Sequence, residues 1–271
     1  MTDLNPQAKQ MADESMVRNL DAQARAIWPQ EAPLFDRYAL PAEARILDAG
    51  CGTGEIASRL AERFPRAQVL GVDIIDDHLA LARERYAGAG SRLRFENQSI
   101  FELRERDATY DLVVCRHVIH SVPYAERVLA ELARVTKPGG WLHVLPEDYG
   151  MLHFQPASLR AFWYEGATSF GANTNTDLYA GRNTYSHLVK LGLTDLRVDY
   201  VIVDTLRVPR DTFASILEAW RDGYVESIEQ LTRFTAAEAT AAFNQMAADI
   251  RDPSRYAVWM VPVVAARVPA R

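Results

Sequence analysis

From residue 45 onward, short apolar runs alternate with longer segments whose apolar residues recur every three or four positions. Short apolar runs that end at polar or glycine-rich stretches are typical of buried strands, and the longer segments are typical of helices that bury one face. Because helices separate most of these strands, we expect an α/β fold with a mostly parallel sheet and helices on both faces. The strands are predicted at residues 45–49, 68–72, 93–98, 110–115, 141–145, 196–204 and 256–267.

Four helices are predicted between these strands, and those at about 56–64 and 128–135 each show one apolar face. Pro65 follows the first of them, as expected just past a helix end. The segment from Lys137 to Gly140 reads Lys-Pro-Gly-Gly and predicts a tight turn into the strand at 141–145. The helices are expected at about residues 56–64, 76–87, 128–135 and 184–191.

The N-terminal 40 residues precede the first strand and form a separate helical arm in our interpretation. Apolar residues recur at helical spacing over residues 6–28, which predicts one or two amphipathic helices. Pro29 and Pro33 are expected to interrupt this pattern. The arm either packs on the domain at residues 41–271 or forms part of a lid over a ligand.

Two insertions interrupt the alternation of strands and helices after the fifth strand. The first, at about residues 147–180, is rich in aromatic and amide side chains. The second, at about residues 209–252, contains two helical stripes, and the latter begins with a capping box formed by Thr235 and Glu238. We expect these insertions to form a cap. Their aromatic residues either line a ligand pocket or form the cap's own core, and the stripe at 211–234 favours the core.

Composition and charge narrow the functional classes. The 271 residues carry a net charge of −6 and contain no block of lysine or arginine, which argues against a general nucleic-acid surface. Cys51 and Cys115 lie far apart and do not make a disulfide framework, so a reducing cytoplasm is expected. No apolar signal core or membrane-length segment is present in the sequence, so we expect no membrane association.

A glycine-rich turn follows the first predicted strand, in the run ILDAGCGTGE at residues 46–55. Glycines at 50, 52 and 54 allow positive φ angles and let the backbone approach a ligand closely. The helix that follows directs its free N–H groups toward the same place. The sequence therefore predicts a cofactor-binding site at this turn.

Dinucleotides and S-adenosylmethionine (SAM) are the two cofactor classes that bind at such turns. Asp73, about twenty residues further on, suits the ribose of either cofactor. A dinucleotide fingerprint starting at Gly50 would need glycine at position 55, where this chain has Glu55. Asp48 would repel a pyrophosphate but attract the ammonium and sulfonium groups of SAM. These two residues favour SAM.

Four blocks in this order resemble class I SAM-dependent methyltransferases: ILDAGCGTGE, VLGVD, YDLVVCRHVIH and LARVTKPGGWLHV. The chain is most similar to the small-molecule group that includes the ubiquinone-biosynthesis type. The resemblance covers residues 45–146 well and is weaker at 180–204 and at the last strand. It implies a Rossmann-like, seven-stranded sheet whose last strand runs antiparallel beside the sixth.

The resemblance also implies roles for individual residues toward the cofactor. Asp48 and the backbone from Gly50 to Gly54 would hold the methionine end, and Asp73 would bind the ribose hydroxyls. Arg116 would approach the methionine portion through its backbone. The full set of cofactor residues implied is Asp48, Gly50, Cys51, Gly52, Gly54, Asp73, Ile74, Ser99, Ile100 and Arg116.

Within this set, Ser99 would make only a weak contact to adenine, and Cys51 has no indicated chemical role. Ile74 would pack on adenine, and Ser99 and Ile100 would meet its edge. Many relatives have aspartate where this chain has Ser99, so a charge-assisted contact to the adenine amine becomes a weaker neutral one. Cys51 is small enough to fit between two glycines, and no partner base indicates that it acts as a nucleophile.

Methyl transfer from a sulfonium is an in-line displacement, so the enzyme must chiefly align the acceptor and exclude water. A general base is needed only if the acceptor loses a proton early. His117 and His120 follow the fourth strand, and Glu147 and Tyr149 follow the fifth; these four are the candidate catalytic residues. They could equally be packing or loop residues.

A metal-dependent mechanism would need clustered carboxylate and amide ligands. Asp148, His153 and Asn173 could be brought together, but their spacing does not indicate a site, so no metal is predicted.

The sequence thus predicts transfer of a methyl group from SAM to an O, N or C atom of a small organic acceptor, with S-adenosylhomocysteine (SAH) as the product. The aromatic insertion favours an apolar or aromatic acceptor. An RNA or protein methyltransferase and a non-catalytic SAM-binding regulator are the alternatives. Monomer and homodimer are both compatible with the sequence.

Overall fold

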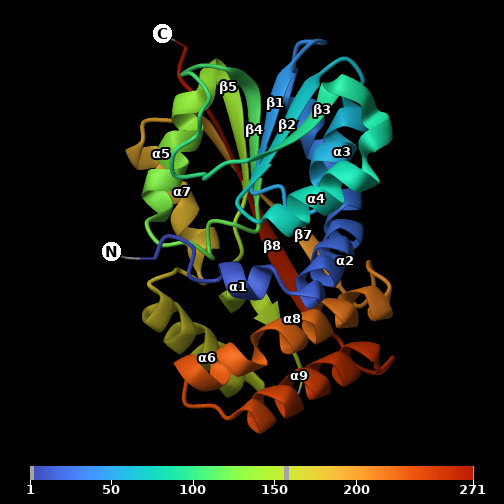
Figure 1. Ribbon diagram of the computed structural model, residues 1–271. Coiled ribbons are helices and arrows are strands. Elements are labelled where there is room, and N and C mark those ends of the chain that lie inside the picture. The colour runs from blue at the N-terminus through green and yellow to red at the C-terminus, as the bar shows by residue number, and fades with distance from the viewer. Residues whose placement is uncertain (1–2, 156–158, 271) are drawn as a thin grey trace.

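A twisted sheet of eight strands forms the centre of the computed structural model, which describes residues 3–155 and 159–270 (Figure 1). The strand order is β3-β2-β1-β4-β5-β8-β6, and β7 also pairs with β8. The strands are β1 (Arg45–Ala49), β2 (Gln68–Asp73), β3 (Leu93–Asn97), β4 (Tyr110–Arg116), β5 (Thr136–Leu145), β6 (Leu152–His153), β7 (Thr194–Asp204) and β8 (Val258–Arg267).

Strand direction follows the expected pattern. β1 to β5 are parallel to their neighbours, and β8 runs antiparallel to β5, β6 and β7. This arrangement confirms the predicted Rossmann-like sheet, with the last strand antiparallel beside the strand predicted at 196–204. The two-residue strand β6 is an addition that the sequence pattern did not predict.

The helices form three groups around the sheet. In Figure 1, α3 and α4 lie on one side and α5 and α7 on the other, while α6, α8 and α9 lie together beyond the carboxyl ends of β1 to β4. The helices are α1 (Ala8–Met11), α2 (Glu14–Glu31), α3 (Glu55–Arg63), α4 (Asp76–Arg85), α5 (Ala125–Val135), α6 (Leu159–Thr174), α7 (Ala180–Lys190), α8 (Arg210–Leu231) and α9 (Ala236–Arg251). Short 3₁₀ helices occur at η1 (Ala32–Tyr38), η2 (Ala87–Arg92) and η3 (Tyr149–Met151).

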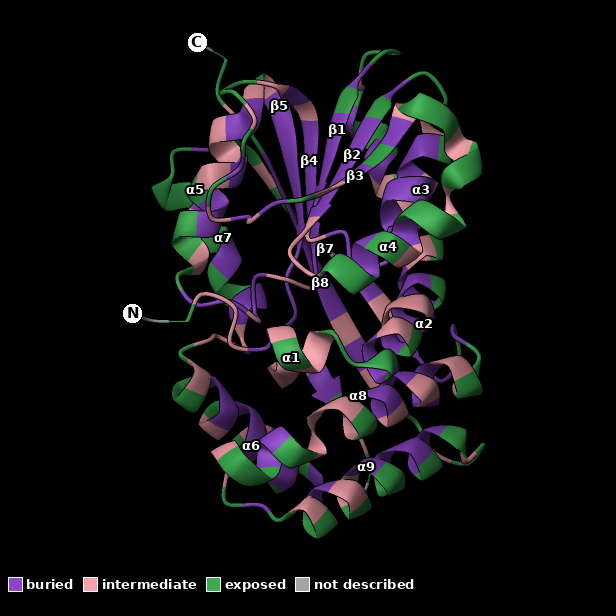
Figure 2. Cartoon of the chain, in the orientation of Figure 1, coloured by how far each residue is buried: buried purple, intermediate pink, exposed green. Residues whose placement is uncertain are grey.

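Apolar burial explains how these groups hold together. The central strands are buried along most of their length, and the outer helix faces are exposed (Figure 2). A separate cluster joins α2, α6, α8 and α9 to β7 and β8. Phe213, Ile216 and Leu217 of α8 are fully buried in this cluster. The apolar stripe of α8 therefore forms part of this hydrophobic core, which is the alternative that the sequence analysis favoured.

The capping box at the start of α9 is present, with Thr235 and Glu238 exchanging side-chain and backbone hydrogen bonds. Residues 156–158 of the insertion predicted at 147–180 lie outside the described residues.

Two local predictions were wrong. Pro29 does not interrupt the N-terminal helix, because it lies in the last turn of α2, where its missing N–H removes only one helical hydrogen bond. The segment from Lys137 to Gly140 is not a turn before β5 but an irregular part of that strand. There the pairing with β4 shifts register, and Gly139 has a φ of +78°.

Candidate functional site

The glycine-rich turn joins β1 to α3 at the carboxyl edge of the sheet, which is the usual ligand-binding edge of such folds. The N–H groups of Gly50 and Cys51 both donate to the carbonyl oxygen of Val72, at 2.8 and 2.9 Å. A Cβ atom on Gly50 would lie 2.3 Å from Val118, so only glycine fits here. The turn is thus held against β2 on one side and the segment after β4 on the other.

Asp73 at the end of β2 anchors the same turn. Its carboxylate accepts hydrogen bonds from the N–H groups of Gly52 (2.8 Å), Ile74 (2.8 Å) and Ile75 (3.0 Å). Asp73 also lines the neighbouring cleft. The carboxylate therefore fixes the local backbone while facing the place where a ligand would bind.

Gly54 provides a stability test of the turn. Its φ is +80°, and a Cβ atom would lie 2.7 Å from the Phe95 ring and 2.9 Å from Ala82. We expect Gly54→Ala to lower the free energy of unfolding by about 2–4 kcal/mol, measured by urea denaturation. Gly192→Ala is the matched control, because Gly192 has a similar φ of +76° but no atom within 4 Å. It should cost only about 1 kcal/mol. Equal losses would contradict the close packing of the turn.

A cleft of about 680 Å³ opens along this edge between the turn, the ends of the strands and the N-terminal arm. Gly50, Gly52, Asp73, Ile74, Ile100 and Arg116 line it, all from the predicted cofactor set. Ser99 is not among its lining residues; its hydroxyl accepts a hydrogen bond from the Phe101 N–H at 3.3 Å. Gln98 lines the cleft beside Ile100 instead. Gly54 faces away from the cleft, toward Phe95.

A smaller cavity of about 370 Å³ continues inward from the turn. Six buried polar atoms of its lining residues have no hydrogen-bond partner in the described part of the chain. They are Gln23 Oε1, Asp48 Oδ2, Thr53 Oγ1, Arg116 Nε, Arg116 Nη2 and His117 Nε2. Buried polar atoms are normally hydrogen-bonded, so this set is suited to a polar ligand. The oxygens suit an ammonium group and the guanidinium suits a carboxylate, so the cavity fits the amino-acid end of SAM.

Asp48 is almost completely buried in this cavity, at the end of β1. Burial, together with the negative charges of Asp73 and Glu31 and against the opposing effect of Arg116, raises the pKa of its carboxyl to about 7. The carboxylate is therefore poorly solvated in the ligand-free protein. A cationic ligand group would stabilise it.

Arg116 enters the cavity with its side chain, whereas the sequence analysis expected a backbone contact. The guanidinium is buried and lines both the cleft and the inner cavity. Its Nε lies 2.9 Å from Glu31 Oε1, and both side chains are almost inaccessible to solvent. Neither Nε nor Nη2 of Arg116 has a hydrogen-bond partner among the described residues.

His117 lies where the cleft and the inner cavity meet. Its backbone has a φ of +57°, and its Nδ1 lies 2.6 Å from Glu147 Oε1. Gln23 Nε2 donates to the same carboxylate oxygen at 3.2 Å. Burial, and then the charge of Arg116, hold the pKa of His117 well below its ordinary value. The ring is therefore neutral, with Nε2 free and facing the cavity.

His120 and Tyr149 lie on the other side of Glu147. His120 Nε2 is 3.7 Å from Glu147 Oε2, and the His120 and Tyr149 rings are 5.7 Å apart. Burial raises the pKa of Glu147, lowers that of His120, and raises that of Tyr149 well above its ordinary range. The structure thus brings together the four candidate catalytic residues, but His120 does not line the cleft or the two cavities described here.

An aromatic cavity of about 540 Å³ lies beyond Tyr149, between α6, α8 and α9. Its described lining has no charged side chain. Gln7 lines both this cavity and the cleft, so the two spaces meet at the N-terminal arm. The lining residues are Gln7, Tyr149, Phe162, Trp163, Gly166, Ala167, Phe170, Leu178, Trp220, Tyr224, Ile228 and Phe243.

The described residues give little support for a metal-dependent mechanism or for a nucleophilic cysteine. No group of three or more His, Cys, Asp or Glu side chains there is placed to hold a metal ion. Asp148 is paired with Arg182, with two contacts of 2.7 Å. Burial raises the pKa of the Cys51 thiol well above its ordinary value, which disfavours a nucleophilic thiolate.

The sequence analysis missed the contributions of α2 and of Thr53. Asn19, Gln23, Ile27 and Glu31 recur every four residues on α2, and all are buried. Polar residues on the apolar face of a helix were the available signal, because a buried polar group needs a partner. Thr53 lies within the glycine-rich turn, so its position in the sequence could have indicated a role in binding. Nothing in the sequence around Gln7 indicated that it lines the cleft and the aromatic cavity.

Within the described ranges, no helix combines the length and apolar character needed to span a membrane.

Comparison with protein families matches residues 46–140 to a family described as a methyltransferase domain. A trans-aconitate 2-methyltransferase of Deinococcus radiodurans is 34% identical over 176 residues, covering 62% of this chain and 66% of the relative. Alignments with the other curated relatives that we compared span 24–47% of the relative's length. The shared region is therefore less than two thirds of each relative.

Two solved structures show the same fold. Phosphoethanolamine N-methyltransferase 2 of Haemonchus contortus, in complex with SAM, has a TM-score of 0.61 at 20% identity, covering 97% of this chain and 60% of that one. The cyclase SpnF has a TM-score of 0.63 at 21% identity, covering 100% of this chain and 98% of that one. Because one of the two is described as a cyclase, the fold alone does not decide the reaction.

Proposed function

We propose that this chain, which carries a class I SAM-dependent methyltransferase domain, transfers a methyl group from SAM to a neutral, largely apolar small molecule. The observation that carries this proposal is that the cleft shares Gln7 with the aromatic cavity, while His117 lines both the cleft and the inner cavity and is hydrogen-bonded to Glu147 at 2.6 Å. In this proposal residues 1–40 and the segments at 147–180 and 209–252 act as a lid and cap over the site.

Each part of the cofactor has suitable residues. Asp73 would accept hydrogen bonds from the ribose, and Ile74 and Ile100 would pack against adenine. The unpartnered oxygens of Gln23 and Asp48 would receive the ammonium group. Arg116 and Thr53 would donate to the carboxylate, in a buried setting where charge-assisted hydrogen bonds are strong.

SAM, when bound, supplies an electrophilic methyl group on a sulfonium. The aromatic cavity holds the acceptor in line and excludes water. His117 Nε2 would accept the proton of an acceptor hydroxyl or amine as the acceptor's lone pair forms the new bond to carbon, or the proton of an acidic carbon before that carbon attacks. The bond between sulfur and the methyl group would break with its electron pair left on sulfur, so that SAH is the leaving group. Glu147 accepts a hydrogen bond from the Nδ1–H of His117 and stabilises the resulting imidazolium.

The cavity's lack of charge supports a neutral acceptor. A carboxylate or phosphate would lose its hydration there without gaining a cationic partner, which is unfavourable. Aromatic side chains from α6, α8 and α9 enclose the cavity from several sides, which suits a small molecule rather than an RNA or protein segment.

Incubation with methyl-labelled SAM tests the proposal against a panel of neutral phenols, amines and activated-methylene compounds, beside polycarboxylates and phosphoamines. We expect label in neutral aromatic products. Label only in the anionic compounds would overturn the acceptor class. SAM binding with no transfer across the panel would favour a non-catalytic regulator.

Gly166→Leu tests the location of the acceptor. Gly166 lines the aromatic cavity, and the nearest atom to an added Cβ is 3.9 Å away, so a leucine would fit and fill part of the space. We expect transfer to fall at least about tenfold while SAH affinity, measured by calorimetry, stays within about twofold. Unchanged transfer would place the acceptor elsewhere.

A further inference from the structure

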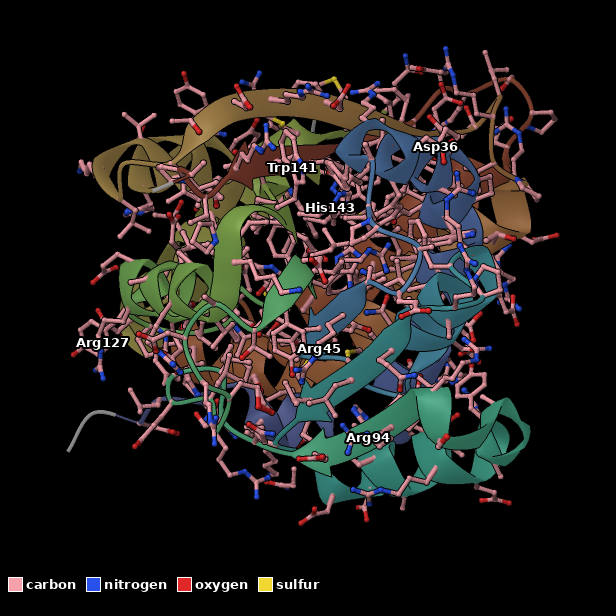
Figure 3. All side chains as sticks on the ribbon, turned by 90° about the horizontal axis from the view of Figure 1, so that it is seen from above. Asp36, Arg45, Arg94, Arg127, Trp141 and His143 are labelled. Carbon is pink, nitrogen blue, oxygen red and sulfur yellow. The ribbon has the colours of Figure 1, made fainter. Side chains whose placement is uncertain are left out.

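A chain of buried polar side chains leads to Arg116 from outside the matched domain at residues 46–140. The Tyr38 hydroxyl lies 2.6 Å from His143 Nδ1, and His143 Nε2 lies 2.9 Å from Glu31 Oε1. The same Glu31 oxygen contacts Arg116 Nε at 2.9 Å. Figure 3 places His143 in the interior, whereas Asp36 of the neighbouring η1 lies at the exposed rim.

The direction of each hydrogen bond follows from the charge of Glu31. Burial acts to raise its pKa, but the charge of Arg116 and the hydrogen bond from His143 outweigh burial and hold the pKa below its ordinary value. An ionised Glu31 can only accept, so His143 carries its proton on Nε2. Its Nδ1 then accepts the hydroxyl proton of Tyr38. Glu31 therefore receives the proton of His143 on one side and faces the positive charge of Arg116 on the other.

We propose that Tyr38, His143 and Glu31 are positioning residues that hold the Arg116 guanidinium for the carboxylate of the cofactor's amino-acid group. This inference rests on the proposed function. Glu31 forms an ion pair with Arg116 at Nε, while neither Nε nor Nη2 has a hydrogen-bond partner among the described residues. Arg116 has several rotatable bonds, so a buried ion pair on one side of the guanidinium restricts where its remaining N–H groups point.

Fold stability alone gives little reason for this arrangement. A buried ion pair is often no more stabilising than apolar residues of similar volume, because both charges lose hydration. Glu31 Oε2 is also buried without a partner. The arrangement is explained if the ion pair with Glu31 orients the Arg116 guanidinium to bind an anion.

Two ligands separate positioning from general stability. SAH and methylthioadenosine share the adenosine and the thioether, but only SAH has the amino-acid carboxylate. A positioning residue of Arg116 should therefore affect SAH and leave methylthioadenosine unaffected. A structural defect in the cleft would weaken both ligands together.

Calorimetry on the full chain tests this with Glu31→Gln and Tyr38→Phe. We expect Glu31→Gln to weaken SAH about 10- to 30-fold and Tyr38→Phe about 3- to 5-fold, with methylthioadenosine within about twofold in both. Tyr200→Phe is the matched control, because Tyr200 is exposed on β7, and it should change neither affinity.

Parallel losses for both ligands, or no loss of SAH affinity in either variant, would overturn the positioning role. Tyr38→Phe keeps the test decisive if Glu31→Gln does not fold, because it removes only one hydroxyl. Wild-type protein that binds neither ligand would overturn the proposed function and this inference together. Wild-type binding without the difference between ligands would overturn this inference alone.

Discussion

His117→Asn should lower the rate of methyl transfer by about 100- to 10,000-fold, the usual contribution of a general base. The variant removes the ring whose free Nε2 faces the inner cavity beside the cleft. Asparagine is among the residues that tolerate the positive φ of +57° at this position, so the backbone should be kept. The measurement is kcat with a labelled acceptor, together with SAH affinity, which should change by no more than about threefold.

Two further variants test whether the loss of activity comes from the His117 ring and its partner Glu147. Glu147→Gln should lower kcat less than His117→Asn, because the amide still accepts from Nδ1 but no longer stabilises the imidazolium. His187→Asn is the matched control, since His187 lies on α7 and lines none of the three spaces. A His117→Asn variant with near wild-type kcat would show that the acceptor needs no base at this position.

Asp48→Asn should weaken SAH binding by about 100-fold or more, because the ammonium group loses its buried anionic partner. For the wild type, we expect SAH affinity to fall up to about tenfold per pH unit below the Asp48 pKa of about 7. The variant should lose that pH dependence. Calorimetry between pH 5.5 and roughly 8.5 measures both effects. A wild-type profile that is flat through pH 7 would contradict the role of Asp48.

The same substitution should stabilise the ligand-free protein. The folded-state pKa of about 7 lies above the ordinary value of 3.8, so the folded state keeps a proton that the unfolded state has lost between these values. Stability is therefore lost as pH rises through this window. Asparagine does not titrate, so Asp48→Asn should raise the free energy of unfolding at pH 8 by roughly 2–4 kcal/mol. It should have little effect at pH 3.5, and urea denaturation at both pH values checks this.

Most of the fold could be predicted because its signals are local. The apolar runs at β1, β2 and β4 sit beside helices with one apolar stripe, and that combination allows few topologies. Features that depend on tertiary contacts were harder. The irregular start of β5 depends on its register with β4, and the short β6 depends on pairing with β8.

The residues of the candidate site also fall into two groups: those that a local sequence pattern predicts and those that only tertiary packing brings together. The glycine turn, Asp48 and Asp73 could be found because their positions follow from one strand and one turn. Glu31 and His143 meet only when α2 packs on the sheet, so no local pattern places them together. The aromatic residues of 147–180 and 209–252 were found, but which of them face a cavity is decided by the packing of α6, α8 and α9.

A crystal structure of the protein with SAH tests the central claim most directly. The account predicts the amino-acid group in the inner cavity between Asp48 and Arg116, with the sulfur facing the junction of His117 and Tyr149. SAH bound with its sulfur directed away from the aromatic cavity, or its amino-acid group outside the inner cavity, would contradict the account.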